Sequence, residues 1–164
     1  MRYLARLAAV ALFLTALPLA AQTGTWTAVA SAGAVDDSSL SAYATSSVEF
    51  QHKPGAVGTI FARYSVTNTF GGGMTDTPPW NTLDLGYYDN SSQGYVTALL
   101  FQVDPCTGIA TLLCGKTSAD TGPGCVSCSF TQQIDFSRYN YVVEVQVSRS
   151  SVNANPAART LRLH

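Results

Sequence analysis

The sequence contains few charged residues. Asp, Glu, Lys and Arg together make up 12% of its 164 residues, about half of the roughly 25% that is typical of globular proteins. The 9 basic residues are balanced by 10 acidic ones, which excludes the basic footprint of a nucleic-acid-binding protein. Hydrophobic residues nevertheless make up 46% of the chain, too many for a disordered protein. The composition therefore indicates one folded domain that is rich in neutral polar residues.

Residues suited to catalysis are also scarce. His52 and His164 are the two histidines, and Glu49 and Glu144 are the two glutamates. His52 precedes Lys-Pro-Gly, a turn in which we expect a solvated side chain, and the sequence has no G-x-S-x-G motif. Each glutamate alternates with apolar neighbours, which places it on a solvated sheet face. We expect that the protein is not an enzyme. The alternative is a secreted glycoside hydrolase that uses Glu49 and Glu144, since such enzymes need two carboxylates roughly 5–9.5 Å apart.

Long apolar runs are absent except near the N-terminus. Two arginines precede an apolar run over residues 7–17, and small residues follow it. A charged start, an apolar centre of about 7–15 residues and a small-residue exit are the parts of a secretory signal peptide, whereas a membrane span needs about 20 apolar residues. We expect residues 1–21 to form a cleaved signal helix. Residues 22–164 then form a single mature domain that is secreted, periplasmic or at the cell surface, without a membrane span.

Helical periodicity is absent from the mature sequence. Short runs alternate instead between apolar and polar residues, as in strands with one face in a core. Residues 95–103 are almost continuously apolar, which predicts a central strand covered on both sides. Further strands are expected at residues 25–30, 42–51, 60–67, 82–88, 109–114, 141–147 and 160–163. About eight or nine short strands without helices between them predict an all-β fold, an antiparallel β-sandwich of the jelly-roll or Ig-like type.

The four cysteines follow the pattern C-x7-C-x10-C-x2-C, at Cys106, Cys114, Cys125 and Cys128. A single CxxC lacks the paired knuckles of a zinc ribbon and the βαβ context of a redox motif. An even number of cysteines behind an export signal indicates two disulfides. A Cys106–Cys114 bridge would require the returning strand of a hairpin to bend sharply. We therefore prefer the pairs Cys114–Cys125 and Cys106–Cys128, although each pairing strains the chain somewhere.

Aromatic residues beside polar turns are the candidates for ligand binding. Trp80 follows two prolines in the long loop after Gly71–Gly73, while Tyr87 and Tyr88 lead into a turn at Asn90. Such rings can stack on the apolar faces of sugars while amide groups bond to the hydroxyls. The alternative for Trp80 is that it anchors its own loop beneath the glycines.

No cofactor is expected, and calcium is the one metal that the sequence leaves open. Asp36–Ser39 and Asp89–Ser92 are oxygen-rich loops of the kind that hold calcium in extracellular modules. Neither loop has the EF-hand pattern, so polar turns are the simpler interpretation. Other aspartates, such as Asp84 and Asp104, lie in or beside turns, where a carboxylate caps its own backbone.

These features favour a non-catalytic secreted or cell-envelope module that acts by binding or as a structural component. One version binds a carbohydrate such as a polysaccharide. The alternative is a subunit of a fimbria-like surface assembly, whose partners would be other surface proteins. Assembly would use an open sheet edge, which presents unpaired N–H and C=O groups, and the terminal strand Thr160–Leu163 is the candidate edge.

Overall fold

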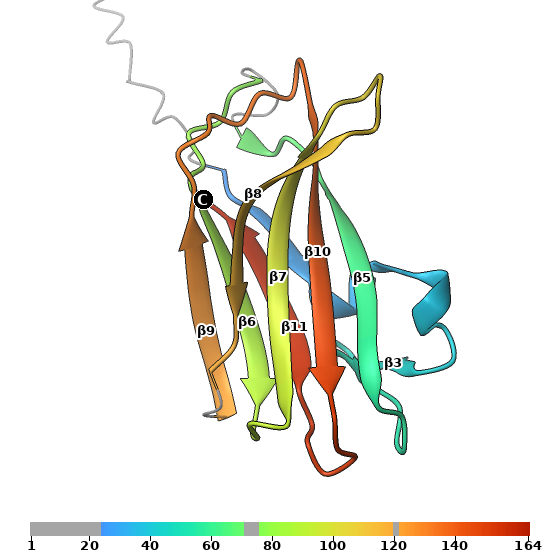
Figure 1. The fold of residues 1–164 in the computed structure, drawn as a ribbon. Helices are drawn as coiled ribbons and strands as arrows, with labels where there is room; N and C mark the ends of the chain where they lie inside the picture. Colours follow the sequence, from blue (N-terminus) through green and yellow to red (C-terminus); the bar gives the residue numbers. More distant parts are fainter. Residues whose placement is uncertain (1–23, 71–75, 120–121) are drawn as a thin grey trace, which may run out of the picture.

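The protein is an antiparallel β-sandwich, which confirms the expected all-β fold (Figure 1). The computed structural model describes residues 24–70, 76–119 and 122–164, so the expected signal peptide and Gly71–Gly73 lie outside the described residues. The strands are β1 (Trp26–Val29), β2 (Ala34–Val35), β3 (Tyr43–Thr45), β4 (Phe50–His52), β5 (Gly58–Val66), β6 (Thr82–Asp89), β7 (Gly94–Val103), β8 (Ala110–Thr117), β9 (Gly122–Ser129), β10 (Asn140–Arg149) and β11 (Ala157–Leu163). Within these ranges, no helix has the length and apolar character to cross a membrane.

The strand count exceeds the expected eight or nine for three local reasons. The predicted strand over residues 42–51 folds back as the β3–β4 hairpin, which is closed by a hydrogen bond from the Ser46 N–H to the Glu49 carbonyl. The second reason is β9, a sequence rich in Gly, Ser and Cys that carries no apolar alternation. The third is β2, which is only two residues long and leaves no pattern in the sequence. Two short 3-10 turns, η1 (Ala30–Ala32) and η2 (Asp37–Ser39), complete the chain before β3.

The six-stranded sheet has the order β3-β4-β11-β6-β9, with β1 paired to the far part of β11. The terminal strand β11 is therefore central, and the prediction that Thr160–Leu163 is an open edge was wrong. Its backbone pairs with β6 on one side and with β1 and β4 on the other. Leu161 and Leu163 of this strand point into the core and are buried. Burial of these two leucines favours an inner position of β11 in the sheet, because burying each one adds about 1.5–3 kcal/mol of hydrophobic stabilisation.

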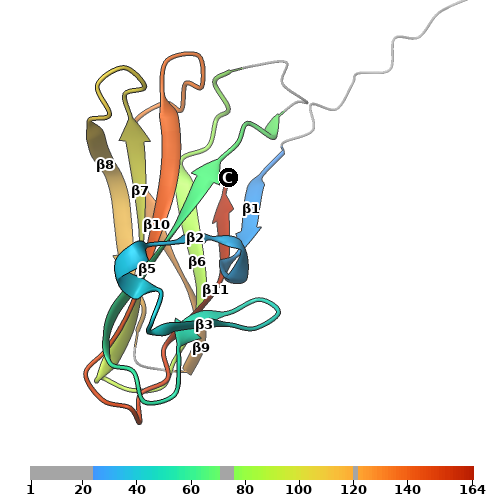
Figure 2. The ribbon, with the colours of Figure 1, turned by 90° about the vertical axis from the view of Figure 1, so that its right-hand side faces the viewer.

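The five-stranded sheet has the order β2-β5-β10-β7-β8. Its strands β5 and β10 alternate as the sequence predicts, with Tyr141 and three valines of β10 fully buried against the other sheet. Figure 2 shows the two sheets from the side of β1, β2 and β3. The expectation that β7 is covered on both sides was wrong. Every second residue of β7 faces outward, and there Tyr95 is 43% exposed while Leu99 and Phe101 are half-buried.

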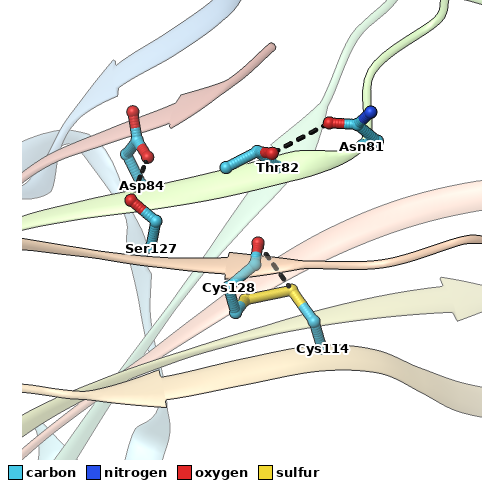
Figure 3. Close-up of a disulfide and its surroundings, with 6 residues drawn as sticks. All are labelled: Asn81, Thr82, Asp84, Cys114, Ser127 and Cys128. Carbon is cyan, nitrogen blue, oxygen red and sulfur yellow. Dashed lines mark hydrogen bonds between the residues drawn. A yellow bond between two sulfur atoms is a disulfide. The ribbon is translucent and has the colours of Figure 1, made fainter.

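One disulfide, Cys114–Cys128, joins β8 to β9 and thereby links edge strands of the two sheets (Figure 3). The expected pairs Cys114–Cys125 and Cys106–Cys128 were wrong, and Cys106 and Cys125 are exposed free thiols. Strand parity gives the reason. Cys125 and Cys128 are three residues apart on one strand and so point to opposite faces, which leaves Cys128 alone to meet the inward-facing Cys114. Cys106 lies in the turn between β7 and β8, away from both.

Candidate ligand-binding groove

A groove lies on the outer face of the five-stranded sheet, where the tip of the β7–β8 hairpin meets β10 and β5. It encloses about 300 Å³, within the range of small-ligand sites. The residues that line it are Arg63, Phe101, Val103, Gly108, Ala110, Val142 and Glu144. In Figure 1 the hairpin tip passes over the upper part of β10 toward the side of β5. Strands far apart in the sequence thus form one concave surface.

The hairpin reaches this position because β8 contains a β-bulge. Leu100 pairs with Cys114 while the next residue of β7, Phe101, pairs with Leu112. Leu113 is therefore an extra residue, and such an insertion bends the strand and increases its right-handed twist. The twist carries the hairpin tip over the outer face, where Gly108 and Ala110 form one wall of the groove.

The turn at the hairpin tip is held by Asp104. Its carboxylate accepts hydrogen bonds from the backbone N–H groups of Cys106 and Thr107, both at 2.9 Å, and these bonds lower the pKa of Asp104. Gly108 has φ +71°, a left-handed conformation that glycine adopts without strain. Asp104 therefore caps its own turn, as the sequence predicts.

The floor of the groove is apolar. Phe101 and Val103 are outward residues of β7, and Val142 is the residue of β10 that lies directly beside Phe101. All three are half-buried. The exposed Leu112 of β8 continues the same row on the other side of Phe101. A contiguous apolar surface on an uncovered sheet face is uncommon unless something binds there.

A row of polar side chains borders this floor. Arg63 of β5 lies beside Glu144 of β10 in the sheet register, and its Nε donates to Glu144 Oε2 at 3.0 Å. The same guanidinium donates through Nη1 to Asp36 Oδ2 at 2.8 Å, while Gln146 Nε2 donates to Glu144 Oε1 at 3.0 Å. The bonds from the Ser38 N–H and from Arg63 lower the pKa of Asp36. Asp36, Arg63, Glu144 and Gln146 form one network, called the polar row below.

The four aromatic and amide residues proposed from the sequence do not gather at one place. Trp80 is buried, donates from Nε1 to the Gly24 carbonyl at 2.8 Å and contacts the Phe136 ring edge-on at 6.0 Å. These contacts join its loop to the segment before β1 and to the loop before β10, while the glycines of the alternative interpretation, Gly71–Gly73, lie outside the described residues. Tyr87 is also buried, and its hydroxyl accepts from the Ala119 N–H at 3.2 Å. Both rings belong to the core, and Trp80 also lines a pocket together with Pro79 and Arg162.

Tyr88 and Asn90 lie nearer the surface but on the other sheet. Tyr88 belongs to the outer face of the six-stranded sheet, where the Arg159 guanidinium sits 5.3 Å from its ring centroid. Asn90 follows β6 and accepts from the Asn155 N–H through Oδ1 at 3.1 Å. Trp80 and Asn90 flank opposite ends of β6, separated by roughly 25–30 Å of strand. The sequence supplied the residue types, while the fold decides which of them face solvent.

The two glutamates proposed for glycoside hydrolysis lie on different sheets. Glu49, in the β3–β4 turn, pairs with Arg159 of the six-stranded sheet at 2.9 Å. Glu144 projects from the outer face of the five-stranded sheet and pairs with Arg63. The core separates the two carboxylates, so they do not share the single cleft that the hydrolase alternative needs.

The outer face of the six-stranded sheet carries a second polar cluster. Asp84 accepts from His164 Nε2 at 3.0 Å and from Ser127 Oγ at 2.7 Å, and Arg162 Nε lies 3.7 Å from it. Asp84 therefore binds side chains across three strands from within β6, and the prediction that it caps a turn was wrong. Period two alone could have placed it on this face, because Leu83 and Leu85 beside it are buried.

His52 is buried, contrary to the expectation of a solvated turn. Its Nε2 lies 3.1 Å from the Gly58 carbonyl, and its Nδ1 is enclosed with no hydrogen-bond partner among the residues that the structure describes. Burial, together with the positive charge of Arg149, lowers the pKa of His52. The residue ends β4 with its side chain toward the core, because Phe50 two positions earlier is also buried.

The loops considered for calcium use their carboxylates in other ways. Asp36 bonds to Arg63 and caps η2 through the Ser38 N–H at 3.2 Å. Asp89 is buried and accepts from Ser118 Oγ at 2.6 Å and from the Ser91 N–H at 3.4 Å. Over the described part of the chain, no three His, Cys, Asp or Glu residues converge as metal ligands.

Comparison with known proteins finds no family for this chain. No family model matches the chain, and no curated protein matches it. Similar solved structures include chains of infectious bursal disease virus from the Gx strain (12% identity, TM-score 0.34) and the Gt strain (14%, TM-score 0.30). Another, described as "CBM4 structure and function", has 11% identity and a TM-score of 0.33. Each likeness covers 85% of this chain, which spans 31% and 32% of the viral chains and 81% of the CBM4 chain.

Proposed function

We propose that the protein is an exported, non-catalytic binding module that holds a polysaccharide in the groove of the five-stranded sheet. The observation that carries the proposal is the apolar floor of Phe101, Val103 and Val142 beside the polar row. Binding sites for small ligands combine a mostly apolar lining with a few placed polar groups. The groove has this combination on a sheet face that is otherwise solvated.

Sugars match such a surface because each ring has an apolar face and a rim of hydroxyl groups. The C–H face can pack on Phe101, as aromatic rings do with apolar groups. The guanidinium of Arg63 offers N–H donors, and Glu144 and Gln146 offer oxygen acceptors to hydroxyls on the rim. Among the described residues, Glu144 is the one carboxylate in the groove lining, and it is bound to Arg63. Asp36, the second carboxylate of the polar row, is bound to the same guanidinium. Both acids are thus paired rather than free for acid–base hydrolysis, which favours binding without cleavage.

The assembly alternative has less support from the sheet edges. The strand proposed for pairing, β11, lies inside its sheet. The two long edge strands carry features that discourage pairing with another chain, namely the bulge at Leu113 and Lys116 on β8 and Pro123 on β9. We therefore place the function on the sheet face rather than on a sheet edge.

Affinity gel electrophoresis tests this function. The mature protein is run through gels containing hydroxyethyl cellulose, glucomannan, xyloglucan or soluble starch, and retardation measures binding. We expect at least one polymer to bind, and Phe101→Ala to weaken that binding by about ten-fold or more, since losing roughly 1.5 kcal/mol of contact corresponds to that factor. Tyr88→Ala is the matched control, an aromatic truncation on the other outer face. Equal losses from both variants, or binding unaffected by Phe101→Ala, would contradict the groove as the site.

A further inference from the structure

The charges at the groove do not cancel. Arg63 and Glu144 are the charged residues that line it, and Asp36 is bound to the outer side of Arg63 at 2.8 Å. One guanidinium thus pairs with two carboxylates, so the cluster of Arg63, Asp36 and Glu144 has a net charge of −1. The Arg63 side chain is 50% exposed, whereas Glu144 is 15% exposed and packs against the floor.

We propose that the groove selects uncharged polysaccharides and excludes carboxylated ones. The proposal deepens the proposed function and rests on it. Two of the Arg63 donor positions, Nε and Nη1, are already occupied by carboxylates of the protein itself. A ligand carboxylate seated on the same floor would lie within a few ångströms of Glu144, where like charges repel, and this repulsion is strongest near low-dielectric protein.

A hydroxyl group of a neutral sugar is not repelled by Glu144. It donates to a Glu144 oxygen and accepts from a remaining guanidinium N–H without adding charge to the cluster. The network also fixes the Arg63 and Glu144 side chains through bonds to Asp36 and Gln146. Two side chains that are already ordered lose little conformational freedom when a neutral ligand arrives.

The experiment compares one polymer chain in two charge states. The neutral polymer that binds best in the gel series is set against its own derivative carboxylated at C6, with binding measured by isothermal titration calorimetry. We expect the wild-type protein to bind the neutral form at least about ten-fold more tightly in about 20 mM salt, and the ratio to shrink in about 500 mM salt, where charges are screened beyond a few ångströms.

Variants change the local charge in steps. Glu144→Gln brings the cluster to zero while keeping an acceptor oxygen, and Asp36→Asn combined with Glu144→Gln brings it to +1, with asparagine still able to cap η2. We expect each step to raise affinity for the carboxylated polymer several-fold. Glu49→Gln is the control, because it removes the same charge from the opposite face of the molecule.

The outcomes separate the two proposals. Neutral binding with rejection of the carboxylated form, relieved by Glu144→Gln and not by Glu49→Gln, supports the selectivity. Equal binding of both forms by the wild-type protein, or an equal effect of Glu49→Gln, overturns the selectivity and leaves the binding function standing. Failure to bind any polymer in either form overturns both.

Discussion

The two outer faces of this sandwich follow the same alternation of residues but differ in what they present. On the six-stranded sheet, Asp84 is bonded to His164 and Ser127, and Arg159 is paired with Glu49. On the five-stranded sheet, the inner strand β7 presents the apolar side chains of Leu99, Phe101 and Val103. Both faces pair polar side chains with one another, but the second face leaves apolar surface in water as well.

This difference indicates on which face a ligand would gain more binding free energy. A ligand on either face would meet polar groups that are already paired, so new polar contacts do not distinguish the two faces. A ligand on the five-stranded sheet removes apolar area from water at about 25 cal/mol per Å² and finds the polar row already in position. The contrast between the faces, more than any single residue, is why we propose the binding site on the five-stranded sheet.

The largest expected effect comes from two neighbouring residues of β7 that face opposite ways. Leu100 is fully buried in the core, and Phe101 beside it faces the groove. Leu100→Ala should lower the free energy of unfolding by up to about 5 kcal/mol, while Phe101→Ala should lower it by about 1 kcal/mol because its ring is only half-buried. Urea denaturation followed by tryptophan fluorescence measures both. A comparable loss in Phe101→Ala would mean that the ring serves the fold and not a ligand.

The inward and outward pattern of the long strands could be predicted from the sequence. β5 and β10 alternate strictly, so Ile60 and Val143 were placed in the core and Arg63 and Glu144 outside it. The meeting of Arg63 with Glu144 could not be predicted, since it depends on β5 and β10 being neighbours in the sheet. Period two assigns a face to each residue but says nothing of which strands lie side by side.

The groove itself left no sequence signal. It depends on the bulge at Leu113, an extra residue in a run that reads as an ordinary strand. The aromatic candidates do not share one surface for a related reason, because Tyr87 and Tyr88 are adjacent and only one of them can face outward. Part of the disulfide pairing could have been predicted from the sequence. The three-residue spacing of Cys125 and Cys128 already implies opposite faces on a strand.

A smaller effect should follow from cutting the link between the sheets on the side of β8 and β9. Cys114 and Cys128 are separated by 14 residues, and a loop of about 15 residues corresponds to about 3 kcal/mol of stabilisation through the unfolded chain. The variant with both residues changed to Ala should lose about that amount in urea denaturation. Cys106→Ser and Cys125→Ser, at exposed free thiols, should change stability by less than about 0.5 kcal/mol. A loss from either single variant would indicate a different pairing.

The smallest effect concerns two buried basic residues, His52 and Arg149. On the outer faces basic side chains pair with carboxylates. Arg149 instead donates to three backbone carbonyls and one side-chain amide, those of Lys53, Ala56, Ala154 and Asn155, and none of these four partners is a carboxylate. Because burial and Arg149 lower the pKa of His52 below its ordinary 6.5, the unfolded chain takes up a proton more readily than the folded protein.

The contribution of His52 to the free energy of unfolding is therefore fully present above pH 6.5 and is lost as the pH falls from there through the folded pKa. Urea midpoints at pH values of about 7.5, 6.5 and 5.5 should decline through this window, and His52→Gln should flatten that part of the decline. His164→Gln, which keeps His52 and alters only the outer face, should retain it. An unchanged slope in His52→Gln would assign the acid sensitivity to carboxylates of the outer faces instead.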